Sequence, residues 1–181
     1  MIPGASNRSV KMIILRVVCI MALIFTVTGC SGTKQIESED MTIELPRGYK
    51  ESELEQATWY YTSQDGLAMG IRVLKSDLEK SGLELDTLRD YVQTYISAND
   101  ISGASDIKER TSPDTGNTYE YFEYEKTISR TGYSYITFFF DDGDYYWVVN
   151  FACYKAMYSE MKPEFKSSAD SVTFTEQKQD D

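Results

Sequence analysis

The chain has 181 residues, a formal net charge of −11 at pH 7 and no histidine. Nucleic-acid binding is not expected, because proteins bind phosphates with an excess of lysine and arginine. The lack of histidine removes the side chain most often used as a catalytic base and as a metal ligand.

The first 29 residues differ in kind from the others. They hold three basic residues and no acidic one, and an apolar run of 11 residues at 17–27 follows the last basic residue, Arg16. This order is typical of a secretory signal peptide. A membrane-spanning helix needs about 20 apolar residues, so the short run favours a cleaved signal.

The end of this segment, Val27-Thr28-Gly29-Cys30, resembles the lipobox of bacterial lipoproteins. The resemblance implies cleavage between Gly29 and Cys30, a diacylglyceryl thioether on Cys30, and anchoring on the extracytoplasmic face of a bacterial membrane. A diacylglyceryl group supplies the two acyl chains that stable anchoring requires. The alternative is that Cys30 is an ordinary cysteine that follows a conventional signal.

Cleavage leaves a chain of about 150 residues, which is the length of one domain. Its net charge is −14, because the signal takes three positive charges with it. Such a charge argues against electrostatic adhesion to anionic lipid, which leaves the acyl chains to hold the protein at the membrane. Cys19 lies in the signal and Cys30 is lipidated, so Cys153 has no cysteine to pair with and is expected to be a buried structural thiol.

The mature chain begins with a polar segment, which is followed by a segment in which apolar and polar side chains alternate. Residues 30–40 are interpreted as the lipidated N-terminus and a tether, 41–175 as a single domain, and 176–181 as a polar tail. Met41–Pro46 alternates apolar and polar side chains, which predicts a half-buried strand. The next strands are expected at Ala57–Ser63 and Leu67–Leu74.

A helical period appears between Leu85 and Ala98, with Asp86 as the expected N-cap. A strand at 106–111 and a loop of turn-forming residues at 112–117 follow. A second helix is expected at about 157–169, where apolar residues recur at intervals of three and four, and a short last strand at 171–174.

The strongest strand signal lies between the two helices. Thr118–Ser129, Tyr133–Phe140 and Tyr145–Ala152 are rich in aromatic and β-branched residues. Asp142-Gly143 predicts a type I′ hairpin between the last two. The consecutive residues Phe138 to Phe140 predict a strand that is covered on both faces. The expected fold is α+β, with an antiparallel sheet and two main helices around one core.

This order of elements resembles the Mog/PsbP-like fold. The resemblance rests on the opening strand that ends in Leu45-Pro46 with Gly48, and on the closing aromatic hairpin, helix and strand 171–174. It covers about residues 40–175 and implies an α/β/α sandwich. It also implies a binding or assembly role, and it brings no catalytic residue to this chain.

Aromatic residues provide the one candidate binding surface. Tyrosine offers a large area with a polar tip, which suits recognition of a protein or a glycan. Several rings are therefore expected to lie together on an exposed sheet face and to contact an envelope protein or glycan. The candidates are Trp59, Tyr61, Tyr119, Tyr121, Tyr133 and Tyr135.

Two alternatives to a non-catalytic binding module remain open. Glu123 and Glu125 lie two apart on a strand and would share a face, as the paired carboxylates of a small cell-envelope hydrolase do. Solute capture for a transporter would need a deep pocket. No cofactor or metal site is expected, because Asp141, Asp142 and Asp144 depart from the calcium-loop pattern. The ligand and the oligomeric state are left open.

Overall fold

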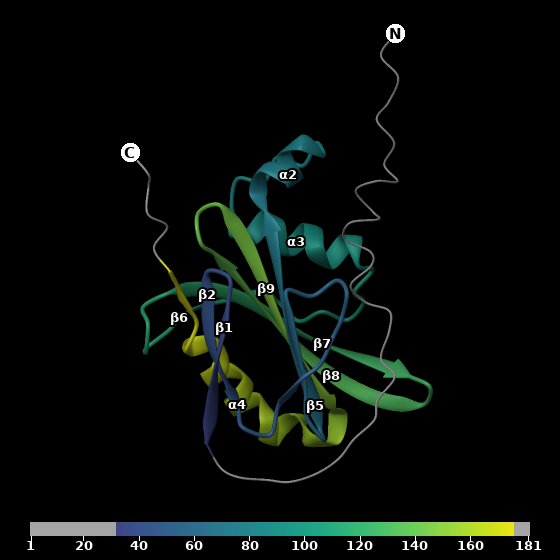
Figure 1. The fold of residues 1–181 in the computed structure, drawn as a ribbon. Coiled ribbons are helices and arrows are strands. Elements are labelled where there is room, and N and C mark those ends of the chain that lie inside the picture. Colours follow the sequence, from purple (N-terminus) through teal and green to yellow (C-terminus); the bar gives the residue numbers. More distant parts are fainter. Residues whose placement is uncertain (1–31, 176–181) are drawn as a thin grey trace.

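The computed structural model describes residues 32–175, which form two antiparallel sheets and three α-helices (Figure 1). The expected signal peptide, the lipid-attachment residue Cys30 and the tail 176–181 lie outside the described residues. The described part confirms the predicted α+β class.

The larger sheet has seven strands in the order β3-β4-β5-β9-β8-β7-β6, and each neighbouring pair is antiparallel. Its centre is the aromatic-rich meander that the composition predicts. The strands are β3 Lys50–Glu51, β4 Trp59–Thr62, β5 Gly66–Leu74, β6 Lys108–Thr111, β7 Thr118–Ile128, β8 Thr131–Asp141 and β9 Tyr145–Tyr154.

A smaller sheet of three strands packs with α4 (Tyr158–Asp170) against one face of the larger sheet. Its order is β1 (Thr33–Ser38), β2 (Met41–Pro46) and β10 (Thr173–Phe174). The prediction of a tether is therefore wrong for Thr33–Ser38, which pair with β2 along their whole length. These residues escape prediction because only Ile36 among them is buried, so they show no apolar alternation.

The helices differ in how well they can be predicted from the sequence. α3 (Leu88–Ala98) was expected, but its N-cap is Thr87 and not Asp86. Thr87 Oγ1 accepts from the Asp90 backbone N–H at 3.2 Å, and Asp90 Oδ2 accepts from the Thr87 N–H at 3.0 Å, which completes a capping box.

α2 (Lys75–Lys80) was not predicted, because it is short and buries only Leu78. A 3₁₀ turn, η1 (Lys155–Met157), leads into α4. Within residues 32–175, every helix is too short or too polar to span a bilayer.

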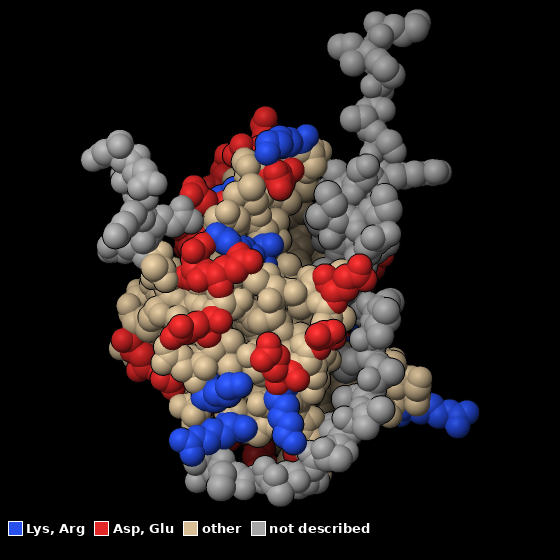
Figure 2. Space-filling view, in the orientation of Figure 1, with Lys and Arg blue, Asp and Glu red and all other residues tan. Residues whose placement is uncertain are grey.

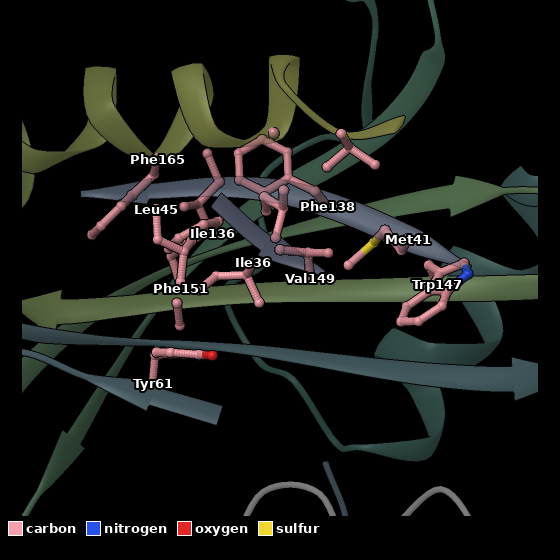
Figure 3. Packing of buried hydrophobic residues seen from close by; sticks show 14 of the residues in the cluster. Ile36, Met41, Leu45, Tyr61, Ile136, Phe138, Trp147, Val149, Phe151 and Phe165 are labelled. Carbon is pink, nitrogen blue, oxygen red and sulfur yellow. The ribbon is translucent and has the colours of Figure 1, made fainter. Parts of the chain in front are cut away.

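The two faces of the large sheet carry separate apolar clusters. The first cluster lies under α4 and the small sheet and includes Phe138 and Phe151. In Figure 3, Phe165 of α4 and Leu45 of β2 lie close to Phe151 and Ile136 of the large sheet. The second cluster lies under α3 and includes Phe139. The prediction that the Phe138–Phe140 strand is covered on both faces is thus confirmed.

The two central hairpins use different turns. Ser129 (φ 50°) and Arg130 (φ 73°) join β7 to β8, and left-handed φ at both central positions is the type I′ pattern. Between β8 and β9 only Gly143 (φ 99°) is left-handed, as in type II′. The type I′ prediction at Asp142-Gly143 is therefore wrong. Asp142 stays at the strand end, where its carboxylate accepts from Tyr145 N–H and Trp147 Nε1, both at 2.8 Å.

Candidate functional site

A groove of about 490 Å³ opens between the small sheet, α4 and the 112–117 loop. It lies where the described chain begins, since Gly32 and Thr33 form part of its wall. Its other lining residues come from β2, the loop and the helix. They are Glu44, Pro46, Asp114, Thr115, Glu164, Ser167, Ser168 and Ser171.

Hydrogen bonds between distant segments hold the groove walls together. Ser112 Oγ donates to the carbonyl of Asp170 at 2.6 Å, and Asn117 Nδ2 donates to the carbonyl of Val172 at 2.8 Å. On the other side, Ser171 Oγ accepts from the Glu44 backbone N–H at 2.9 Å. The loop and the small sheet are thereby both fastened to the end of α4.

A partly buried ion pair, in which Asp170 is buried and Arg110 reaches the surface, fixes this end of α4. The Asp170 carboxylate accepts from Arg110 Nε at 2.9 Å, from Arg110 Nη2 at 2.6 Å and from Tyr119 Oη at 2.7 Å. Burial acts to raise the pKa of Asp170, but the hydrogen bonds from Arg110 and Tyr119 outweigh burial and leave the pKa lowered. Asp170 is therefore a charged structural residue that lies beneath the groove.

The groove is chemically suited to a ligand that donates hydrogen bonds. Carboxylates of Glu44, Asp114 and Glu164 accept only, while the hydroxyls of its serine and threonine residues donate and accept. Hydroxyl-rich or basic groups match such a lining. Among residues 32–175 there is no cluster of three or more side chains that could hold a metal ion.

Sequence reasoning did not find this groove. Its residues are mostly polar and come from four separate segments, so neither spacing nor composition brings them together. The sequence predicts a loop at 112–117 but gives no sign that the loop lines a groove.

The predicted aromatic surface is wrong for five of its six residues, which are buried in the core. The exposed fractions are 6% for Trp59 and Tyr61, 0% for Tyr119, 7% for Tyr121 and 5% for Tyr135. The first four lie in the cluster under α4, whereas Tyr135 lies on the opposite face. Tyr133 alone is half-buried, and its ring stacks on Tyr154 with 5.4 Å between centroids. These rings serve the core because the sheet is covered on both faces.

The paired carboxylates of β7 share one face, as predicted, but each is bound to a lysine. Glu123 accepts from Lys162 Nζ and Tyr158 Oη, both at 2.7 Å, and Glu125 accepts from Lys155 Nζ at 2.5 Å. Burial acts to raise the pKa of Glu123, but the hydrogen bonds outweigh it and the pKa is lowered. This is opposite to the raised pKa that a catalytic acid needs.

The aspartates of the β8–β9 turn do not join these glutamates. Glu123 is opposite Ile136 in the sheet, five residues along β8 from Asp141, which is a distance of about 17 Å. Asp141 lies on the other face and accepts from Lys75 Nζ at 2.5 Å. The arrangement therefore does not assemble the cleft that the hydrolase alternative requires.

Cys153 is buried, with 2% of its surface exposed. Burial, helped by the nearby charge of Asp65, raises the pKa of its thiol to about 11. A thiol with so high a pKa is protonated at neutral pH and is a poor nucleophile, which agrees with the structural role expected from the sequence.

No protein-family model matches the chain, and neither does any curated protein sequence. Solved structures do resemble it. The solution structure of cyanobacterial PsbP (CyanoP) from Synechocystis matches with a TM-score of 0.55 at 13% identity, over 81% of this chain and 94% of that one.

Two further structures agree. The Ran-binding protein Mog1p of Saccharomyces cerevisiae matches with a TM-score of 0.51 at 10% identity, over 80% of this chain and 96% of that one. A protein of Bacteroides thetaiotaomicron matches with a TM-score of 0.52 at 11% identity, over 76% of this chain and 46% of that one. At these identities the likeness concerns the fold alone, and that fold is PsbP/Mog1-like.

Proposed function

We propose that this chain is a lipid-anchored extracytoplasmic protein that acts as a non-catalytic binding or assembly module. The observation that carries the proposal is the lipobox-like sequence Val27-Thr28-Gly29-Cys30 directly after an export-type apolar segment. Lipid on Cys30 places the domain at the outer face of the cell membrane. Its partner is then an envelope protein or glycan.

Two features of the domain support binding over catalysis. The carboxylates of Glu123, Glu125, Asp141 and Asp170 are engaged in ion pairs that tie elements together. The groove at the start of the described chain instead presents carboxylates and hydroxyls toward solvent. It is the site that we assign to the partner.

The anchor is tested by metabolic labelling with a radioactive or clickable fatty acid in a bacterial host. The wild-type chain is expected to incorporate label, and Cys30→Ser is expected to lose it and to accumulate as the longer precursor. Cys153→Ala is the matched control, since it removes the other cysteine of the mature chain. Label that persists in Cys30→Ser, or disappears in Cys153→Ala, contradicts a lipid on Cys30.

The binding role is tested by photocrosslinking in intact cells. A photoreactive residue at Ser167, which is exposed in the groove, is expected to give a discrete adduct with an envelope component. The same residue at Glu109, an exposed position of the edge strand β6 outside the groove, is expected to give none. Equal adducts from both positions, or none from Ser167, would count against the groove as the binding site.

A further inference from the structure

We infer that the end of the domain beside Cys30 faces anionic lipid headgroups, while the opposite end, near the β8–β9 turn, points away from the membrane. The inference rests on the proposed lipid anchor and adds an orientation and a lipid preference to it.

The distance from the lipid to the folded domain is short. Only Ser31 and Gly32 separate Cys30 from Thr33, the first residue of β1. Three Cα-to-Cα steps of about 3.8 Å limit the separation to about 11 Å.

Arg47 fixes the direction in which the chain leaves the domain. Its backbone N–H donates to the Gly32 carbonyl at 2.9 Å, and its Nε donates to the Thr33 carbonyl at 3.2 Å. The anchored residue is therefore attached at one defined end of the molecule.

That end carries three exposed cations that form no ion pair among the described residues: Lys34, Arg47 and Lys50. Lys34 and Lys50 are neighbours in the fold, because Lys34 Nζ lies 5.1 Å from the Tyr61 ring and Lys50 pairs with the adjacent Thr62. Arg47 lies beside Lys34, because its Nε donates to the carbonyl of Thr33. Figure 2 shows several Lys and Arg at the lower end of this face, where the described chain begins, and Asp and Glu scattered over its middle and upper parts together with a few other Lys and Arg. Anionic headgroups attract such a group of cations.

The opposite end of the sheet is acidic. Tyr146 lies close to several carboxylates there. Its pKa is raised mainly by burial, and to a smaller extent by the negative charges of Asp141, Asp90, Asp86 and Glu79. Tyr146 lies opposite Val73 at the end of β5, whereas Tyr49, next to Lys50, approaches Gly66 at its start. The nine residues of β5 separate the two ends by about 26 Å.

The basic end attracts anionic lipid only modestly. Carboxylates lie near these cations. The negative charge of Glu51 contributes to the raised pKa of Tyr61, and the charges of Asp65 and Glu164 contribute to that of Tyr49, in both cases after burial. These carboxylates offset part of the positive charge at this end. The cations therefore orient a domain that the acyl chains already hold, and they do not bind it to a membrane by themselves. In this orientation the groove lies beside the headgroups, since Gly32 and Thr33 line it.

The experiment measures energy transfer in the full lipidated protein, purified with its lipid verified by mass and reconstituted into vesicles. A donor on Glu79→Cys in a Cys153→Ala background marks the far end, and an acceptor lipid marks the bilayer surface. Phosphatidylcholine vesicles are compared with vesicles containing phosphatidylglycerol. We expect lower transfer with phosphatidylglycerol, and we expect transfer to rise toward the phosphatidylcholine value at about 0.5 M NaCl because salt screens the attraction.

Charge reversal supplies the matched comparison. Lys34→Glu with Lys50→Glu is expected to abolish the difference between the two lipids. Lys80→Glu with Lys108→Glu, the same change of charge elsewhere, is expected to keep it. Equal transfer in both lipids for the wild-type protein, or the same loss in both double variants, overturns the orientation. A purified protein without lipid overturns the anchor itself, so the two failures are distinguished.

Discussion

Gly70 of β5 lies directly against the indole ring of Trp59 in the neighbouring strand. A Cβ atom at Gly70 would lie 2.1 Å from Trp59 Nε1 and 2.2 Å from Cε2, closer than atoms can approach. Trp59 is itself packed in the core, with 6% of its surface exposed, so the ring cannot move aside without displacing its neighbours.

Gly70→Ala is therefore expected to lower the free energy of unfolding by about 1–3 kcal/mol, the usual range for overpacking a core. Urea unfolding followed by tryptophan fluorescence measures the change. Gly48→Ala is the control, because a Cβ there meets nothing within 4 Å, and it should alter stability by less than about 0.5 kcal/mol. Equal midpoints for the two variants would show that the Trp59 contact is not tight.

Asp170 makes the acid stability of the protein testable. Its pKa is lowered in the folded state, so the folded protein binds fewer protons here than the unfolded chain does. Its contribution is present above the unfolded pKa of about 3.9 and is lost as the pH falls through the lower, folded value.

Asp170→Asn is expected to cost about 1–3 kcal/mol at pH 7, because Arg110 and Tyr119 lose a charged acceptor. The loss of stability below about pH 4 should also become shallower than in the wild-type protein. Urea midpoints measured across the acid range test both points. Asp106→Asn, at an exposed position, should reproduce the wild-type profile. Parallel pH profiles for Asp170→Asn and the wild type would contradict the lowered pKa.

Among the elements, α3 shows how a helix start is chosen between adjacent candidates. Both Asp86 and Thr87 are good N-cap residues, but only Thr87 has an acidic residue three positions later that can return a hydrogen bond. Thr87→Ala is expected to lower the free energy of unfolding by about 1 kcal/mol. Asp86→Ala should leave it nearly unchanged. Thermal unfolding followed by circular dichroism distinguishes them, and the reverse order would assign the cap to Asp86.

Sequence patterns predicted the elements that bury one continuous stripe or face. β2, β5, the three central strands and both long helices carry enough apolar residues at a regular period to be recognised. β1 and α2 each bury a single residue, so their structure comes from pairing and packing that no local pattern records. The predicted aromatic surface is wrong for a related reason: tyrosine occurs in buried strands as readily as on exposed surfaces, so its abundance does not distinguish the two.

At the scale of the whole molecule, β1 connects the proposed anchor to the main core. Ile36, its one buried residue, belongs to the same cluster as Phe151 and Trp147 of the large sheet (Figure 3). The strand next to the proposed lipid site therefore packs into the folded domain through Ile36, although most of its side chains are exposed.

Ile36→Ala should therefore destabilise the entire domain and not β1 alone. Removing a buried isoleucine costs about 2–5 kcal/mol when the cavity cannot collapse. If β1 unfolds together with the core, the urea midpoint reported by tryptophan fluorescence falls while the slope with urea is unchanged, because the surface exposed on unfolding is the same. Gln35→Ala, one residue away and exposed, should leave the midpoint in place. An unchanged midpoint for Ile36→Ala would mean that β1 can detach while the core stays folded. The proposed lipid would then be joined to the domain through a longer segment, and the orientation that we infer from Arg47 at the start of β1 would be lost.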